Sequence, residues 1–248
     1  MRKLLAMLDA NRGKGAGFRA EDKDGTAVLY VYDAIGPWGV EAAPFVQAVR
    51  GLGAKKIELR VNSPGGDVFD ARAMKNALED FDGEIVAYVD GLAASAASYL
   101  MLAADEIVMG EGAFAMIHKA WGLTIGNADE HRAQAALLDK VDDTLVADYV
   151  ARTGKGADDI RAKMAAETWF TAEEAVAFGL ADRVAAPPKR KDKNKEASAR
   201  WDLSAYAQPP AALIAPAPPP ESPADPLALL ATERERCLAR LGLYERVV

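Results

Sequence analysis

Ser95 and His118 of this 248-residue chain are of the residue types that act as a nucleophile and as a base. Ser95 lies in GLAASAASYLMLAA, where the apolar run EIVAYVDG gives way to a helical pattern. Its small neighbours would let a substrate backbone approach closely, and a helix N-terminus supplies free N–H groups and a positive dipole end. Taken alone, the stretch favours a simpler interpretation, in which Ser95 caps the helix and Ser98 is a small packing residue one turn later.

A nucleophilic serine needs a base, and the chain has 2 histidines. His131 lies in NADEHRAQ, on the polar early part of a predicted helix, which is a surface position. His118 follows the apolar letters FAMI in GAFAMIHKAWG, where a buried core histidine is the simpler interpretation. His118 is therefore the candidate base, but its position alone does not establish that role.

A glycine pair lies in VNSPGGDVFDA, between a predicted strand and a predicted helix. Gly65 and Gly66 follow a proline, and glycine adopts backbone conformations closed to other residues. Their N–H groups, near a helix N-terminus, would suit an oxyanion. An ordinary tight turn explains the same letters. Strand order decides whether this loop lies beside Ser95, and the sequence does not give that order.

The elements that must position these residues alternate between strand and helix patterns. We expect strands at 26–36, 55–63, 84–93 and 105–110, and helices at 40–53, 67–81, 94–104, 128–152 and 171–180. Thr171 and Glu174 form a capping box at the start of the last helix. This βαβ alternation predicts an α/β fold with a largely parallel sheet covered by helices.

Composition narrows the class of protein. Half of the residues are hydrophobic, which fits one large α/β domain, and the net charge of −7 argues against a nucleic-acid binder. The single cysteine, Cys237, excludes a disulfide framework and a multi-cysteine zinc site, and is compatible with a reducing cytoplasm. The chain has no apolar run of transmembrane length, and its first residues lack the apolar core of a signal peptide.

The C-terminal part differs in composition from the rest. Ten of the 13 prolines follow residue 186, which predicts a disordered, extended linker over 187–224. The basic run KRKDKNK within it is interpreted as solvated tail. DPLALLATERERCLARLGLYERV has a helical apolar spacing and predicts a short amphipathic helix within 225–248. Residues 1–26 are the N-terminal segment, and 27–186 are the folded domain.

Four motifs together resemble one family in order and spacing: NSPGGDV, GLAASAAS, MIHKA and ETWFTAEEAVAFGLADRV. They resemble the Clp protease proteolytic-subunit family, and most closely its phage branch, the ClpP-like head maturation (prohead) proteases. The resemblance covers roughly residues 27 to 185. It implies the ClpP/crotonase-like fold of stacked ββα units and the activity of an ATP-independent serine endopeptidase.

The resemblance also implies site residues. Carried over motif by motif, Ser95 is the nucleophile and His118 the general base. The N–H groups of Gly66 and Ala96 form the oxyanion hole, and Gly65 and Gly66 contact the substrate. No metal or cofactor is expected.

The third member of the triad departs from the family pattern. The family has an aspartate just before its aromatic FxSAxEA segment, and the aligned residue here is Glu167 in AAETWFTAEE. A glutamate can orient a histidine, although its longer arm needs a different approach. A surface charge at a helix end explains it equally simply. Asp139, Asp142 and Asp143 are alternatives on the long helix.

Partners follow from the resemblance as expectations. LLDKVDDTLVADYVARTGKG resembles the handle region, which implies a homo-oligomeric ring, and the stripe Leu137, Leu138, Val141 and Leu145 is then either interface or packing on its own domain. The segment that docks an AAA+ unfoldase is not recognisable, so no ATPase partner is expected. The phage branch implies a capsid or scaffold protein as substrate, in the host cytoplasm or inside a procapsid. The C-terminal tail would then be a tether or a product of autocleavage.

Three other functions stay open. Crotonase-fold enzymes bind acyl-CoA thioesters with two backbone N–H groups, but they use carboxylates rather than a serine and a histidine. A non-catalytic scaffold or assembly protein with a degenerate site is compatible with the irregular third member. A serine–lysine peptidase would need a buried lysine, and the histidine of MIHKA is a simpler base.

Overall fold

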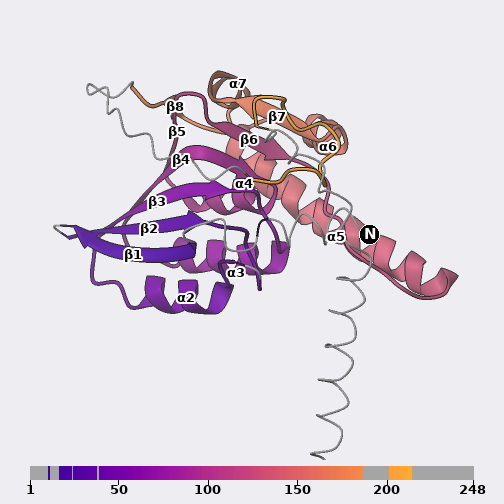
Figure 1. Cartoon of the computed structure of the whole chain (residues 1–248), viewed down its shortest axis with the longest axis horizontal. Coiled ribbons are helices and arrows are strands. Elements are labelled where there is room, and N and C mark those ends of the chain that lie inside the picture. The colour runs from indigo at the N-terminus through magenta and orange to yellow at the C-terminus, as the bar shows by residue number, and fades with distance from the viewer. Residues whose placement is uncertain (1–10, 12–16, 24, 38, 187–200, 214–248) are drawn as a thin grey trace, which may run out of the picture. The chain divides into compact units, whose positions relative to one another are not determined.

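The structure is a computed structural model, and it describes residues 11, 17–23, 25–37, 39–186 and 201–213 (Figure 1). These residues all belong to one compact unit, Met1–Ile214. The basic run KRKDKNK and the helix predicted within 225–248 lie outside the described residues.

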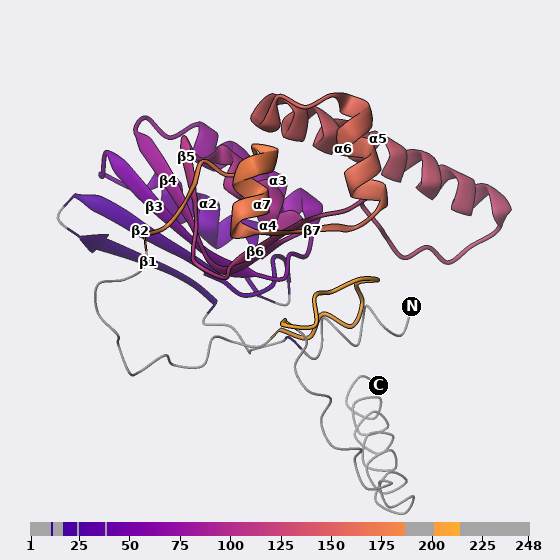
Figure 2. The ribbon, with the colours of Figure 1, turned by 90° about the horizontal axis from the view of Figure 1, so that it is seen from above.

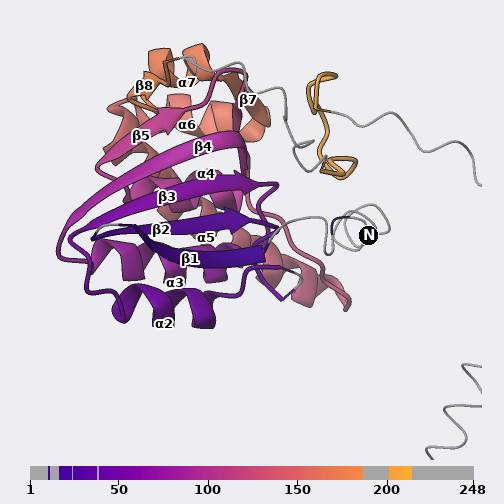
Figure 3. The same ribbon diagram turned by 60° about the vertical axis from the view of Figure 1, so that its left-hand side comes forward.

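A mixed sheet is the framework of this unit. Its strands are β1 (Gly17–Lys23), β2 (Thr26–Tyr32), β3 (Lys56–Ser63), β4 (Glu84–Ala94), β5 (Glu106–Met109), β6 (Phe114–Ile117), β7 (Thr168–Thr171) and β8 (Arg183–Val184). The order is β1-β2-β3-β4-β5-β8, with β6 paired to both β4 and β7. β2, β3, β4, β5 and β8 run parallel, whereas β1 is antiparallel to β2 and β7 to β6. Figure 3 shows β1 to β5 in this order.

The long strand β4 has two neighbours on one edge. Its first half pairs with β5 over Val86–Val89, and its last residues, Leu92 to Ala94, pair with β6. The two short strands therefore follow different halves of β4. As a result, β6 runs beside the carboxyl end of β4, where the chain turns into the next helix.

The helices of the described residues, α6 excepted, lie where the sequence predicts them. They are α2 (Ala42–Arg50), α3 (Val68–Glu79), α4 (Ala96–Leu100), α5 (Ala128–Thr153), α6 (Ala157–Ala165) and α7 (Ala172–Phe178), with the 3-10 turn η1 (Met101–Ala103) after α4. α7 begins at the capping box of Thr171 and Glu174, which confirms that prediction. α5 begins at a capping box of Asn127 and ends at Gly154, which adopts a left-handed conformation. Figure 2 shows α5 and α6 side by side, where Arg161 of α6 forms an ion pair with Asp143 of α5.

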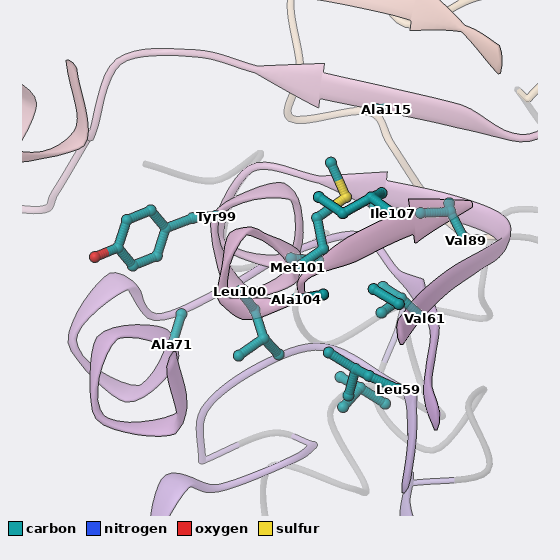
Figure 4. Close-up of a cluster of buried hydrophobic side chains, with 14 of the residues drawn as sticks. Leu59, Val61, Ala71, Val89, Tyr99, Leu100, Met101, Ala104, Ile107 and Ala115 are labelled. Atoms are coloured by element: carbon teal, nitrogen blue, oxygen red, sulfur yellow. The ribbon is translucent and has the colours of Figure 1, made fainter. Parts of the chain in front are cut away.

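The core lies between the parallel strands and the helices. Figure 4 shows Leu59 and Val61 of β3, Val89 of β4 and Ile107 of β5 beside Leu100 and Met101 of the α4–η1 segment. All six side chains are buried. Burying each of them contributes roughly 1.5–3 kcal/mol relative to exposure. The helix that follows β4 is therefore fixed against the sheet by its own apolar residues.

Three features differ from the expected organisation. β1 begins at Gly17, so the sheet starts inside the predicted N-terminal segment 1–26. The elements β6, α6, β7 and β8 lie outside the ranges predicted from the sequence. The predicted linker 187–224 is also not extended throughout, because Trp201, Leu203 and Tyr206 within it are buried against the domain. We call residues 201–208 the C-terminal strap.

Candidate active site

Ser95 occupies a strained turn between β4 and α4. Its backbone has φ 55° and ψ −122°, a conformation that costs energy for any residue except glycine. Its backbone N–H donates to the Met116 carbonyl at 2.9 Å, which ties the turn to β6. Its hydroxyl makes no capping bond to α4, so the helix-cap interpretation of Ser95 is wrong. The turn instead presents the side chain at the carboxyl end of β4.

His118 directly follows β6 and meets that hydroxyl. The pairing of Ala94 with Met116 aligns the ends of β4 and β6, so the residues just beyond them come together. The Ser95 Oγ and His118 Nε2 atoms lie 2.7 Å apart. His131, in contrast, is exposed on α5, as expected. The sheet register therefore selects His118 as the histidine that reaches the serine.

Burial lowers the pKa of His118 to about 4, and the nearby Glu167 charge acts in the opposite direction. Desolvation disfavours the charged imidazolium, so the imidazole is neutral at pH 7. A neutral Nε2 can accept the hydroxyl proton of Ser95. The electrostatics of the site thus match the role of a general base.

The glycine loop after β3 lies directly against the serine turn. Gly65 has φ +90°, and a Cβ atom built on it would lie 2.5 Å from the Ala94 carbonyl oxygen and 2.8 Å from the Ser95 Cβ. Only glycine fits at that separation. The strand order therefore brings SPGG and Ser95 side by side, which the sequence alone left open.

The next residue, Gly66, is held by a bridge to Ile35. The N–H of Ile35 donates to the Gly65 carbonyl and the N–H of Asp67 donates to the Ile35 carbonyl, each at 2.9 Å. This pattern leaves the Gly66 N–H outside the bridge. The N–H of Ala96, the first residue of α4, likewise has no acceptor within its helix.

Ser98 has a larger part in the site than packing. It is fully buried, and its Oγ lies 2.8 Å from the Ser95 carbonyl oxygen, 2.7 Å from the Met116 carbonyl oxygen and 2.9 Å from the Tyr149 hydroxyl. These contacts tie α4, β6 and α5 together beneath the serine turn. The spacing of three residues from Ser95 was visible in the sequence, but the partners come from distant elements.

Glu167 lies near His118 but is bonded elsewhere. Its carboxylate accepts hydrogen bonds from the backbone N–H groups of Ala207 and Gln208, at 2.8 and 2.7 Å, and from the Trp169 indole N–H at 3.3 Å. No hydrogen bond joins it to His118 in the described part of the chain. Its link to the histidine is the effect of its charge on the pKa.

Two of the three alternative carboxylates on α5, Asp142 and Asp143, have other partners. Asp142 is buried, and its Oδ1 accepts the Ala120 N–H at 2.7 Å, two residues beyond His118. Burial raises the pKa of Asp142. Asp143 pairs with Arg161 at 2.8 Å. Among the described residues, neither has a hydrogen bond to His118.

A cavity of about 400 Å³ opens beside Ser95 and His118. Its walls include Ser95, His118 and mostly apolar side chains, among them the α5 stripe of Leu137, Leu138, Val141 and Leu145. Val141 and Leu145 are buried in their own domain, whereas Leu137 is 46% exposed. The packing expectation for the stripe therefore holds for its second half, and the interface expectation stays a prediction.

The residues that the structure describes include neither a cluster of metal ligands nor a membrane-spanning helix. They contain no group of three or more His, Cys, Asp or Glu side chains that could hold a metal ion. No helix among them has the length and apolarity needed to cross a membrane.

The comparison with known families agrees with the geometry. The family model described as Clp protease matches residues 51–188, more than half of the chain. The matched range contains Gly65, Ser95, His118 and Glu167. The chain belongs to the Clp protease family. The α/β fold expected from the sequence is confirmed. The family match does not distinguish the phage branch from other members of the family.

Curated relatives within this Clp protease family are moderately similar. The chain is 34% identical over 134 residues to "ATP-dependent Clp protease proteolytic subunit 1" of Protochlamydia amoebophila, covering 52% of this chain and 65% of the relative. It is 30% identical over 132 residues to the protein of the same name from Leifsonia xyli, covering 52% and 67%. It is 27% identical over 142 residues to "ATP-dependent Clp protease proteolytic subunit-related protein 2, chloroplastic" of Arabidopsis thaliana, covering 56% and 50%. The chain thus spans about half to two thirds of the length of these relatives.

Proposed function

We propose that this protein is a serine endopeptidase with Ser95 as nucleophile and His118 as general base. The observation that carries the proposal is the 2.7 Å contact between Ser95 Oγ and His118 Nε2, made on a strained turn at the end of β4. The names of the curated relatives, which describe proteolytic subunits, support it. So does the lowered pKa of His118, which keeps the imidazole neutral at pH 7.

Each step uses groups of this chain. His118 Nε2 takes the hydroxyl proton as Ser95 Oγ attacks the peptide carbonyl carbon, and the carbonyl oxygen becomes an oxyanion. The N–H groups of Gly66 and Ala96 stabilise that charge. The C–N bond then breaks, His118 returns the proton to the leaving amine, and water attacks the acyl-enzyme with His118 again as base. Losing one oxyanion donor would reduce the rate on the order of 10²- to 10³-fold.

Glu167 is assigned an electrostatic part in this mechanism. His118 becomes positively charged in the transition state, and the Glu167 carboxylate favours that charge, as its effect on the pKa indicates. A hydroxyl–imidazole contact of this kind has no use in an acyl-CoA enzyme that acts through carboxylates. We therefore favour peptide hydrolysis over the crotonase-type alternative.

The finer assignment rests on the motifs NSPGGDV, GLAASAAS and MIHKA. They resemble the phage head maturation branch, so we propose a capsid or scaffold protein as the substrate, met in the host cytoplasm or inside a procapsid. The likeness of α5 to a handle region supports a homo-oligomeric ring. Hydrolysis by Ser95 and His118 consumes no nucleotide, and we propose that an ATPase is not required.

Co-expression with candidate phage capsid and scaffold proteins tests the substrate. The parent chain should shorten one of them, detected by intact-mass measurement, and Ser95→Ala should not. His118→Ala should abolish the shortening as well. His131→Ala is its matched control, because both changes remove one histidine but only His118 lies at the site. Hydrolysis of short fluorogenic peptides by the parent, without cleavage of any capsid or scaffold protein, would keep the peptidase and reject the phage substrate.

A further inference from the structure

The C-terminal strap lies on the ends of β4 and β6, beside Ser95 and His118. Trp201, Leu203 and Tyr206 are buried, and they pack with Leu92 and Ala94 of β4 and with Met116 of β6. These strand residues are the ones that immediately precede the serine turn and His118. The strap thus contacts the two strand ends that build the site.

Polar contacts fix the strap on both sides of the groove. On one side, the Trp201 indole N–H donates to Asn62 Oδ1 at 3.3 Å, and the Tyr206 hydroxyl donates to the Pro64 carbonyl oxygen at 2.5 Å. On the other side, the N–H groups of Ala207 and Gln208 donate to the two oxygens of Glu167. The strap therefore bridges the glycine loop after β3 and Glu167.

Tyr206 stands closest to the reacting groups. Its ring is edge-on to the His118 ring, with centroids 5.5 Å apart, and edge-on to Trp169 at 5.6 Å. It also lines the cavity that holds Ser95. A peptide that ran from the end of β6 to the glycine loop to reach Ser95 would meet this side chain, which lies between His118 and Pro64.

We infer that residues 201–208 are an intramolecular plug of the catalytic groove, which binds there as a peptide and excludes the substrate until it is displaced. The inference rests on the proposed peptidase function. The strap engages the base by ring contact, the glycine loop through the Pro64 carbonyl and both oxygens of Glu167 by backbone N–H groups. A segment that only supported the fold would not need to contact all three.

Loosening the plug in the full chain should speed the reaction of Ser95 with a fluorophosphonate probe. For Tyr206→Ala we expect a rate at least about tenfold above that of the parent, because a closed state limits the reactive fraction. Trp201→Ala should act in the same direction, and its indole contacts Asn62 rather than His118, so it loosens the strap without touching the base. Ser204→Ala is the matched control, because that side chain is exposed. An unchanged or lower rate in both Tyr206→Ala and Trp201→Ala, with unchanged melting temperatures, would overturn the inference.

Peptide binding tests the plug without catalysis. The probe is a fluorescent peptide of the sequence WDLSAYAQ, and the protein is the full chain carrying Ser95→Ala, Trp201→Ala and Tyr206→Ala. We expect saturable binding that is weaker in a chain with Ser95→Ala alone, whose own strap competes. A peptide with alanine in place of its tryptophan and tyrosine should not compete. Equal, absent or non-saturable binding would contradict the inference.

The two readouts separate this inference from the proposed function. Peptide binding without any labelling of Ser95 in any variant would keep the groove and reject the peptidase. Labelling of Ser95 in the parent, with no rise in the strap variants and no peptide binding, would keep the peptidase and reject the plug.

Discussion

The Nε2 atom of His118 lies 2.7 Å from the Ser95 hydroxyl, and this imidazole has a pKa lowered to about 4 by burial. The base must be neutral to accept a proton, so activity is lost as the pH falls through that pKa. We predict that Ser95 labelling in the parent chain is constant from neutral pH down to pH values well below 6.5, the ordinary pKa of histidine, and falls only near pH 4. In Tyr206→Ala, which uncovers the ring, the fall should move toward pH 6.5. The rate of probe attachment, measured from pH 7 downward in buffers of constant ionic strength, locates the fall in the parent chain and in Tyr206→Ala.

Gly65→Ala should disable the site. The new methyl group would lie 2.5 Å from the Ala94 carbonyl oxygen in a residue with φ +90°, so the glycine loop and the serine turn must separate. We expect a rate reduced on the order of 10²-fold or more, the range for losing one oxyanion donor. Gly112→Ala is the control, because Gly112 also has a positive φ, +75°, but nothing lies within 4 Å of the new Cβ. Equal losses in the two variants would show that backbone strain, rather than the close approach, matters.

Ser98→Ala should destabilise the protein. The change leaves the buried Tyr149 hydroxyl without the partner that lies 2.9 Å away, at a cost of about 1–3 kcal/mol in the free energy of unfolding. Adding Tyr149→Phe removes the orphaned hydroxyl and should recover part of that loss. Urea unfolding of the single and double variants measures the free energies, and a double variant no more stable than Ser98→Ala would argue against the pairing.

Glu167→Gln is best tested with the strap already loosened by Tyr206→Ala. The carboxylate charge raises the pKa of His118, so its removal should shift the acid limb of labelling to lower pH. The rate at neutral pH should fall roughly tenfold, which is less than the roughly 10²- to 10⁴-fold that a general acid or base itself contributes, because Glu167 acts only through His118. Glu173→Gln, at an exposed position on α7, is the charge-matched control. A reduced rate with an unshifted acid limb would assign Glu167 a structural role only.

Much of the fold was predictable because local patterns decided it. The strands at 55–63 and 84–93 and the capped helices followed from apolar periodicity and capping residues, and the structure confirms them. β7 was missed because TWFT has only 4 residues and depends on pairing with β6. β1 was missed because GFRAEDK is mostly polar, and its partner β2 decides its conformation.

The sequence singled out Ser95 and His118, whose side chains the structure brings together, but it said less about the residues around them. Ser95 and His118 were named from their motifs, but their contact depends on the pairing of β4 with β6, which no local pattern gives. The strap was not predicted, because the proline-rich composition of the sequence around it is typical of a linker. Three apolar residues in WDLSAY were the available signal, and their burial depends on a groove made by distant strands.

The most direct test of the account is to label the purified parent chain with a fluorophosphonate probe and locate the adduct by mass spectrometry. We predict a single adduct on Ser95 that is lost in Ser95→Ala, reduced at least about 10³-fold in rate in His118→Ala, as expected for members of one catalytic unit, and unchanged in His131→Ala. An adduct on another residue, or labelling of Ser95 that does not depend on His118 in the parent or in the Tyr206→Ala background, would contradict the account.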